Sequence, residues 1–305
     1  MTQIDIADLD CIYLSYDEPQ KEEFWIQIQN MVPWAKRVHG VKGSDAAHKA
    51  CAELSETDRF ITVDGDNRIR EEFLNQEIDF DEHADLKNTV ISWCGRNEIN
   101  GLMYGNGGLK CWPRDYVLKM KTHENADPDN AHAQVDFCWD AQYIQMNSTY
   151  SDVYNNETPA QAWRAGFREG VKLATDRGVR ISKEELKNNH WRCLHWLYIW
   201  SMIGKDVENG DWAILGTRAG LYMTMCTDWD YVQVRDFEYL NDLWKVSFES
   251  IEDVDREIEE YGIKLINELD IPISEQPLDA QQSKFFKVVY QHPARTDHQR
   301  FIEKL

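Results

Sequence analysis

Two carboxylates separated by one residue form the strongest chemical signal in this chain. Asp64 and Asp66 stand in the segment FITVDGDN, directly after a run of apolar residues. Such a run predicts a buried strand, so both carboxylates follow its carboxyl end. Carboxylates at this spacing can share a hard divalent cation, Mn²⁺ or Mg²⁺, together with its phosphate ligands. The alternative is an ordinary acidic turn, because Asp-Gly-Asp also occurs in loops that bind nothing.

A turn and a helix of small residues precede this strand. Residues 40–52 contain two glycines, four alanines and the basic side chains of Lys42, His48 and Lys49. Small residues allow a helix to pack closely on a sheet, and basic side chains at that edge could reach a pyrophosphate or a nucleobase. A lone basic residue on a helix is more often solvated, so His48, between small residues, is the better candidate.

The elements around these residues alternate between strand and helix. Hydrophobic patterning predicts strands over residues 9–16, 34–41 and 59–63, with helices over 20–30 and 44–54 between them. This alternation predicts a parallel sheet with helices on both faces. In such sheets ligands bind at the carboxyl ends of the strands, where Asp17 and Asp64 stand.

The rest of the chain continues this pattern and then becomes helical. Further strands are predicted over 89–93 and 135–139, and a helix is predicted to begin near Pro113. We therefore expect an α/β fold with a Rossmann-like, mostly parallel sheet and flanking helices in residues 1–155. A helical region is expected over 156–305, with helices at 158–176, 183–203 and 211–225 and two acidic helices within 236–269.

Composition limits the function classes. The 305 residues carry a net charge of −21 and 12% aromatic residues, which indicates a globular chain and argues against a general nucleic-acid coat. The stretch 160–195 is locally basic, so any anion site is expected to be local. Without a long apolar run, a secretory signal or paired cysteines, we expect a cytoplasmic protein that does not enter a membrane.

Three motifs in order resemble the nucleotide-sugar half of the family-two-like GT-A glycosyltransferases. That family has a strand ending in N-E, a helix G-x-x-x-A-R-N-x-G and a strand ending in D-x-D. Here Asp17-Glu18 stands at the first motif, V-K-G-x-x-A-A-H-K-A at the second and Asp64-Gly65-Asp66 at the third. His48-Lys49 replaces Arg-Asn, which is a departure from the family pattern.

Two later segments extend the resemblance over about residues 9–145. Gly107 and Gly108, followed by Arg114, resemble the family's G-G-x-x-x-x-R element. Asp140, after Trp139, resembles the acidic element that carries the family's catalytic base, and Asp136 is the competing candidate.

The resemblance implies a metal-dependent transfer of a sugar from a UDP-sugar to a hydroxyl group. Mn²⁺ or Mg²⁺ would bind Asp66, with Asp64 sharing the cation or holding the ribose, and Asp140 would act as general base. This scheme predicts inversion, and retention stays open. The implied donor-binding residues are Ser15, Tyr16, Asp17, Lys42, His48, Asp64 and Asp66, and the implied acceptor residues are Gly107, Gly108, Trp112 and Arg114.

The segments PWAKRVHGVKG, GNGGLKCWPR and NGDWAILGTRAG also resemble phage-encoded, DNA-modifying glycosyltransferases. This resemblance implies 5-hydroxymethylcytosine in duplex DNA as the acceptor, glucose or arabinose as the sugar, and the cytoplasm of an infected bacterium as the location. A DNA face would then consist of exposed tryptophans (Trp93, Trp112, Trp139) and basic residues (Arg164, Arg168, Lys172, Arg177, Arg180). Alternatively, the tryptophans line a sugar site or the core.

Other functions stay open from the sequence. The same enzyme class could act on a surface glycan or a small molecule. The fold could also serve as an inactive nucleotide-sugar-binding module, or as a nucleotidyltransferase that releases pyrophosphate. A third metal ligand could come from His190 or His195, although two histidines in an aromatic helix are more often structural.

Overall fold

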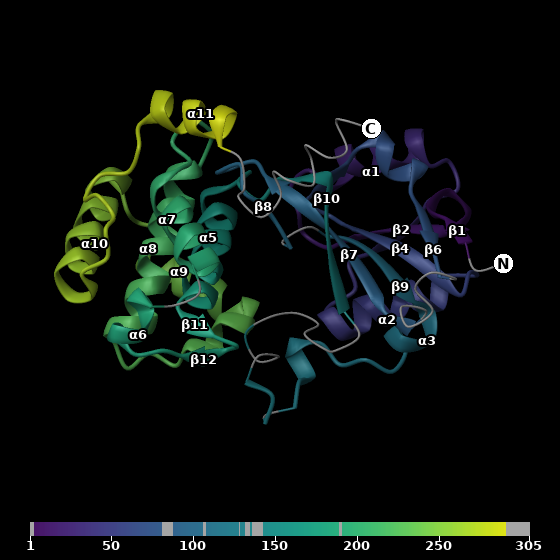
Figure 1. The fold of residues 1–305 in the computed structure, drawn as a ribbon, viewed down its shortest axis with the longest axis horizontal. Coiled ribbons are helices and arrows are strands. Elements are labelled where there is room, and N and C mark those ends of the chain that lie inside the picture. The colour runs from purple at the N-terminus through teal and green to yellow at the C-terminus, as the bar shows by residue number, and fades with distance from the viewer. Residues whose placement is uncertain are drawn as a thin grey trace.

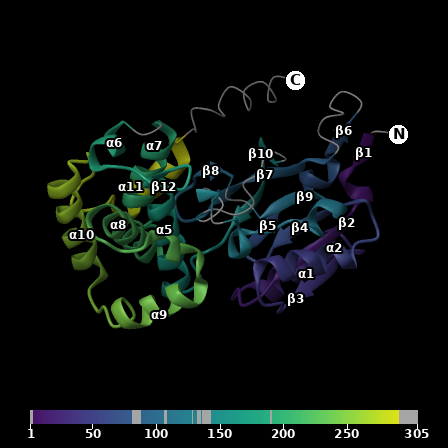
Figure 2. The same ribbon diagram turned by 90° about the horizontal axis from the view of Figure 1, so that it is seen from below.

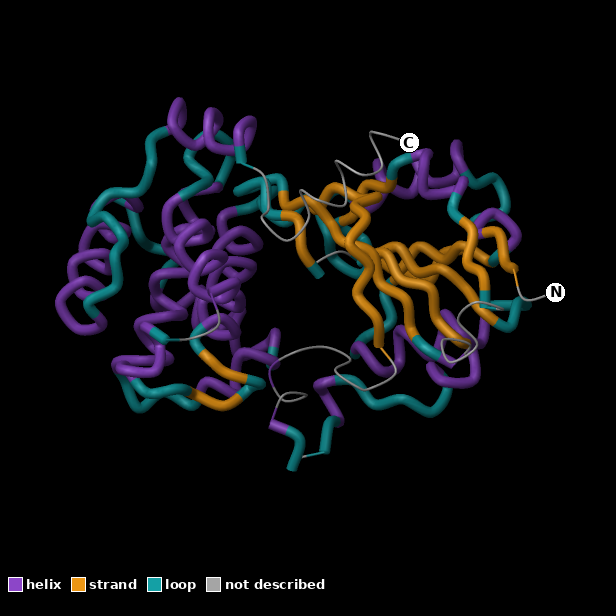
Figure 3. Tube along the Cα trace, in the orientation of Figure 1, coloured by secondary structure: helices purple, strands orange, loops and turns teal. Residues whose placement is uncertain are grey.

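The computed structural model describes residues 3–80, 88–105, 108–127, 129–131, 135, 143–188 and 191–290, with the backbone alone for residues 191–193. Most of the strands gather in one half of the molecule and most of the helices in the other, where the short pair β11 and β12 also lies (Figures 1 and 3). The view from below shows the same division (Figure 2). The chain is therefore mixed α/β, as the sequence predicts.

The first half of the main sheet is parallel. Strand β2 (Asp10–Ser15) pairs in parallel with β3 (Lys36–His39) and with β4 (Arg59–Asp64). Helices α1 (Lys21–Met31) and α2 (Ser44–Leu54) connect these strands. The predicted alternation of strand and helix over the first 64 residues is confirmed.

The second half of the main sheet is mixed. Strand β9 (Leu109–Pro113) runs antiparallel to both β4 and β7 (Val90–Asn97). Strand β10 (Tyr143–Val153) is parallel to β7, while β5 (Asn67–Ile69) and β8 (Met103–Tyr104) pair antiparallel. The expectation of a mostly parallel sheet therefore holds only from β2 to β4, because β9 runs back through the middle of the sheet.

One sequence prediction in this region needs correction. No strand was predicted for the segment that forms β9, and the helix expected to begin near Pro113 is only the short α3 (Arg114–Val117). The predicted strand over 135–139 lies almost wholly outside the described residues. The smaller elements are β1 (Gln3–Asp5), β6 (Glu77–Asp79), β11 (Thr175–Asp176), β12 (Val179–Arg180) and the 3-10 helices η1 (Ile6–Asp8), η2 (Glu71–Asn75), η4 (His123–Asn125) and η5 (Tyr231–Arg235).

Alternate residues along the parallel strands enter two hydrophobic cores, one on each face of the sheet. Tyr13 and Val63 pack in the core that contains the inner face of α1. Ile12 and Phe60 pack in the core beneath α2. This period-two pattern fixes the register, since a shift by one residue would exchange the two faces.

The second half of the chain is helical, although one predicted helix is divided. The stretch 183–203 forms two helices rather than one, α6 (Lys183–Lys187) and α7 (Trp191–Met202). The others are α5 (Pro159–Leu173), α8 (Gly210–Cys226), α9 (Phe237–Ser247), α10 (Val254–Leu269) and α11 (Ala280–Val289). No helix within the described ranges combines the length and the apolar character that crossing a membrane requires.

Helices α5 and α8 cross at very short range. A Cβ on Gly166 of α5 would lie 1.9 Å from the carbonyl oxygen of Ala213. A Cβ on Gly216 of α8 would lie 2.1 Å from the carbonyl oxygen of Trp163. Only glycine fits at these positions, so the two helices form the rigid centre of the helical half.

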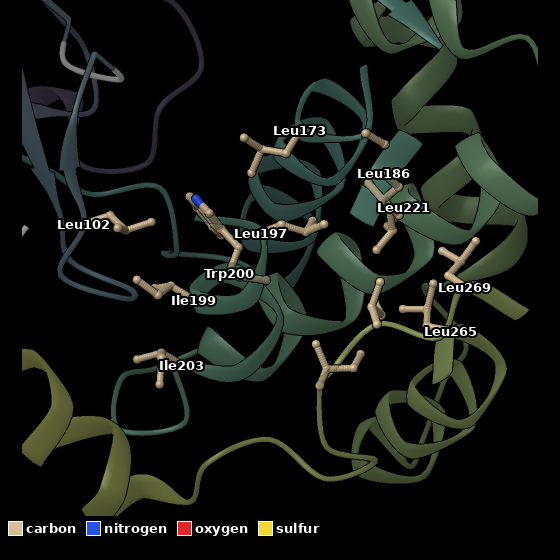
Figure 4. Packing of buried hydrophobic residues seen from close by; sticks show 14 of the residues in the cluster. Leu102, Leu173, Leu186, Leu197, Ile199, Trp200, Ile203, Leu221, Leu265 and Leu269 are labelled. Carbon is tan, nitrogen blue, oxygen red and sulfur yellow. The ribbon is translucent and has the colours of Figure 1, made fainter. Parts of the chain in front are cut away.

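The two halves share a hydrophobic cluster. Leu102, from the turn between β7 and β8, packs with Leu197 and Trp200 of α7 (Figure 4). A second link comes from α11, where Nζ of Lys287 donates hydrogen bonds to the carbonyl oxygens of Glu98 and Ile99 at 3.1 and 3.3 Å. These contacts join α7 and α11 to the turn between β7 and β8.

Candidate functional site

The carboxylates predicted to do chemistry meet at one edge of the sheet. Leu14 on β2 is paired with Asp64 on β4, and the two strands are parallel. The residues after each strand therefore emerge side by side, with Asp17 and Glu18 after β2 and Asp66 after β4. This edge is the one at which ligands bind in open parallel sheets.

Glu18 belongs to this group, although the sequence identified only its neighbour Asp17 as a donor-binding residue. The Glu18 carboxylate accepts a hydrogen bond from the backbone N–H of Tyr16 at 2.7 Å. It lies so close to Gly65 that a Cβ there would be 2.5 Å from its Cδ. The Gly65 carbonyl is held in turn by the hydroxyl of Tyr13, which donates to it at 2.8 Å.

Asp66 is oriented by its own neighbour. Nδ2 of Asn67 donates to Oδ1 of Asp66 at 2.7 Å, while Oδ1 of Asn67 accepts from the backbone N–H of Gly108 at 3.1 Å. The backbone N–H of Tyr154 donates to the Asp66 carbonyl at 2.8 Å. Asn67, whose role the sequence did not reveal, thus connects the acidic turn to the start of β9.

The electrostatics of the group favour a cation. Burial, together with the negative charges of Asp64 and Glu18, raises the pKa of Asp66 to about 7. Burial also raises the pKa of Glu18, with added repulsion from Asp17 and Asp64. Carboxylates that share a site and destabilise one another's charged forms are typical of sites that bind a cation or transfer protons.

The donor atoms suit a hard divalent cation, although the geometry is not that of a preformed metal site. Carboxylate and amide oxygens of Asp64, Asp66, Glu18 and Asn67 are the ligand type that Mg²⁺ and Mn²⁺ prefer. Within the described ranges, no three His, Cys, Asp or Glu side chains lie together as a metal-binding group. A cation here would therefore take further ligands from phosphate oxygens or water.

Strand β9 contributes a lysine that the sequence did not identify. Nζ of Lys110 lies 4.0 Å from Oδ2 of Asp64, and the lysine side chain is largely buried. Gly108 packs even more closely, since a Cβ there would be 2.2 Å from Cβ of Asp64. In the sequence, the polar Lys110 stands between the apolar Leu109 and Cys111. This alternation could have predicted a strand with Lys110 on the face of the site.

His48 lies next to this group but is buried. Its Nδ1 is 2.8 Å from the carbonyl oxygen of Ser44, and its ring meets Trp112 edge-on at 5.3 Å. Burial lowers the pKa of His48, and the charge of Asp64 opposes this effect. A neutral imidazole whose Nδ1–H donates to a backbone carbonyl leaves Nε2 as an acceptor, so it offers a phosphate neither a donor nor a charge.

Two of the acceptor residues predicted from the sequence lie elsewhere. Because β9 is antiparallel to β4, Leu109 is paired with Val63 near the site, and Pro113 is paired with Arg59 at the opposite edge. Trp112 is fully buried, with its indole N–H donating to Thr62 at 2.8 Å, and Arg114 donates to the Ala52 carbonyl at 2.8 Å. The structure therefore places Trp112 in the core and Arg114 away from the carboxylate group.

The remaining donor-binding candidates lie at the same edge and differ in their exposure and in their contacts. Oγ of Ser15 accepts a hydrogen bond from Nε of Arg37 at 3.1 Å and lies 3.0 Å from Nδ1 of His39. The ring of Tyr16 is nearly half exposed. Lys42 forms an exposed ion pair with Glu238 of α9 and so joins the two halves.

Several candidates fall outside the described residues. These are Gly107, both candidates for the catalytic base (Asp136 and Asp140), Trp139 and His190. His195 is described, and its Nε2 lies 2.7 Å from the hydroxyl of Tyr290 in the helical half. That contact supports the structural alternative for His195 rather than a third metal ligand.

The residues expected to form a DNA face do not form one exposed surface. Trp93 and Trp112 are buried in the two cores, so the expectation that they are exposed is wrong. Arg180 is held by the carbonyl oxygens of Thr227 and Trp229. Of the five basic residues proposed, only Arg177 is classed as exposed.

Comparison with known proteins adds no assignment. No protein-family model matches this chain, and no curated protein matches it.

Proposed function

We propose that this chain is a metal-dependent glycosyltransferase that moves a sugar from a UDP-sugar to a hydroxyl acceptor. The observation that supports the proposal most strongly is the group of carboxylates at the ends of two adjacent parallel strands, β2 and β4. Their order along the chain matches the order of the GT-A motifs, and the raised pKa values of Asp66 and Glu18 indicate a site short of positive charge.

The fold is compatible with this proposal. Strands β3, β2 and β4 form a parallel sheet with α1 and α2 on opposite faces. Sheets of this kind bind nucleotides at the carboxyl ends of their strands. The GT-A assignment itself depends on the motifs, because strand β9 makes the sheet mixed.

Each residue of the site has a separate role in the proposal. Asp66 and Asp64 bind Mn²⁺ or Mg²⁺, which supplies positive charge to the diphosphate leaving group when it is bound. Asn67 holds Asp66 in one orientation, and Lys110 partly neutralises the negative charge of Asp64. Glu18 is the third carboxylate of the group. Asp140, or alternatively Asp136, accepts the proton of the acceptor hydroxyl, which gives inversion.

Two classes of acceptor are compatible with the proposal. 5-Hydroxymethylcytosine in phage DNA is the acceptor that the motifs predict. A surface glycan or a small molecule is favoured by the burial of Trp93 and Trp112 and by the net charge of −21. A cytoplasmic location is part of the proposal, and the buried thiols of Cys11, Cys51 and Cys111 agree with a reducing compartment.

The experiment measures UDP release from a panel of UDP-sugars with Mn²⁺, with and without duplex DNA containing 5-hydroxymethylcytosine. Mass spectrometry of the nucleosides identifies any transferred sugar. Release that DNA stimulates, together with a heavier nucleoside, supports the DNA acceptor. Release that DNA leaves unchanged supports the glycan or small-molecule acceptor. Pyrophosphate release in place of UDP would identify a nucleotidyltransferase.

A further inference from the structure

Two arginines on α5 share one aromatic ring. The guanidinium carbons of Arg164 and Arg168, which are one helical turn apart, lie 5.0 and 4.7 Å from the ring centroid of Phe237 on α9. Nη1 of Arg164 also donates to Oδ1 of Asn241 at 3.0 Å. The ring and the amide thus hold two like charges one helical turn apart.

Arg164 lies near the carboxylates of the sheet. Asp17, Glu18 and Asp66 all act on the pKa of Arg164, so its guanidinium lies within electrostatic reach of them. Arg164 nevertheless forms no ion pair with any carboxylate in the described part of the chain. The ion pair between Lys42 and Glu238 brings the first turn of α9, including Phe237, against the same edge of the sheet.

A partly buried cation without a direct counterion is costly, and an anion between the two charged groups would remove this cost. Guanidinium groups suit phosphate because their planar donors match two phosphate oxygens at once. A cation held by Asp64 and Asp66 would attract the same phosphate from the other side.

We propose that Arg164 and Arg168 bind a phosphate group located between α5 and the carboxylates that follow β2 and β4, and that this phosphate belongs to the diphosphate of the nucleotide donor. The proposal rests on the proposed function for the identity of the donor. It replaces the expected role of these two arginines in a DNA face. The same chemistry could also bind a phosphodiester of a nucleic-acid acceptor, and the test separates these two sources.

The test compares dissociation constants for the wild type, Arg164→Gln and Arg168→Gln by isothermal titration calorimetry. The probes are inorganic pyrophosphate, UDP with Mn²⁺, and a duplex oligonucleotide. Arg256→Gln is the control, because Arg256 is an exposed arginine on α10 and its loss changes the net charge equally. Circular dichroism checks folding, and Arg164→Lys replaces Arg164→Gln if the latter does not fold.

The proposal predicts that each glutamine variant binds pyrophosphate and UDP at least tenfold more weakly, while Arg256→Gln binds like the wild type. Arg164→Lys should show a smaller loss, since lysine keeps the charge but not the paired donors. Unchanged dissociation constants for both phosphate probes would overturn the proposal. A loss confined to the oligonucleotide would overturn the assignment to the donor.

The outcomes also separate this inference from the proposed function. If the wild type turns over a UDP-sugar and the variants bind UDP normally, the glycosyltransferase remains and the arginine site is rejected. If pyrophosphate binding depends on the arginines but no UDP-sugar is turned over, the phosphate site remains and the glycosyltransferase is rejected.

Discussion

The carboxylate of Glu18 lies against the α-carbon of Gly65, with room for no side chain between them. A Cβ on Gly65 would be 2.5 Å from the carboxylate carbon. This contact brings the end of β2 to the acidic turn that follows β4 and unites carboxylates from two strands in one group. Glycine at position 65 is therefore required by close packing, in addition to its place between Asp64 and Asp66.

We predict that Gly65→Ala reduces turnover at least tenfold, because the added methyl group displaces Glu18 and distorts the turn that holds Asp66. Steady-state kinetics with the active UDP-sugar measure the effect. Glu18→Ala/Gly65→Ala is the control for packing: the double variant should recover the stability that Gly65→Ala loses, since the methyl group then has space. If Gly65→Ala destabilised the wild type and the Glu18→Ala variant equally, the close contact between Glu18 and Gly65 would be contradicted.

The raised pKa of Asp66 predicts a specific pH dependence of stability. The folded state holds the Asp66 proton with a pKa of about 7, whereas an unfolded aspartate has a pKa near 3.9. The folded state therefore binds more protons between these values, and the free energy of unfolding should fall as the pH rises from about 4 to about 7. Asp66→Asn should lack this decrease.

Mn²⁺ should reverse the effect, because it binds the ionised carboxylates. We expect its addition to raise the Tm at pH 8 by roughly 2–4 °C, and by less at pH 5.5. Thermal unfolding in EDTA and in Mn²⁺ at both pH values provides the measurement. An equal response at both pH values, or one that Asp66→Asn retains, would count against the cation site.

Substitutions of Lys110 and Arg114 test whether the site lies where the structure places it or where the sequence predicted it. Lys110→Met should lower turnover about 10- to 100-fold, because it removes the positive charge beside Asp64. Arg114→Gln should leave turnover within about twofold, since Arg114 lies at the opposite end of β9 and binds a backbone carbonyl. The reverse order of effects would place the acceptor as the sequence predicted.

The sequence predicted the first part of the fold well because its pattern is local. Apolar strands such as 59–63 end at polar residues, and the small-residue helix 44–54 matches α2 (Ser44–Leu54). These elements place Asp64 and Asp66 at a sheet edge without any information from the rest of the chain.

The sequence failed where distant pairing decides the structure. Strand β10 (Tyr143–Val153) consists largely of polar, half-exposed residues and forms through pairing with β7 and β5, so it has no apolar pattern. Strand β9 follows two glycines, and no strand was predicted there. Without that strand, the sequence could not show that Arg114 lies at the opposite end of β9 from Asp64 or that Lys110 lies beside Asp64.

The crossing of α5 and α8 gives a prediction that does not depend on function. An alanine in place of an exposed helical glycine normally stabilises a protein by about 0.5–1 kcal/mol. Gly216→Ala should instead destabilise the protein by about 2–3 kcal/mol, because its Cβ would overlap the Trp163 carbonyl. Urea unfolding measures the change, and a neutral or stabilised variant would contradict the close crossing.

If Asp64 and Asp66 form the metal-dependent donor site of a glycosyltransferase, UDP release from UDP-sugars with Mn²⁺ must depend on them. This release is measured in the wild type, Asp66→Asn and Asp58→Asn. Asp58 is the matched control, because it is an exposed aspartate at the opposite end of β4. We expect release by the wild type and Asp58→Asn, loss of release with EDTA, and at least a hundredfold decrease in Asp66→Asn. Release that persists in Asp66→Asn, or no release by the wild type with any UDP-sugar, would contradict this donor site.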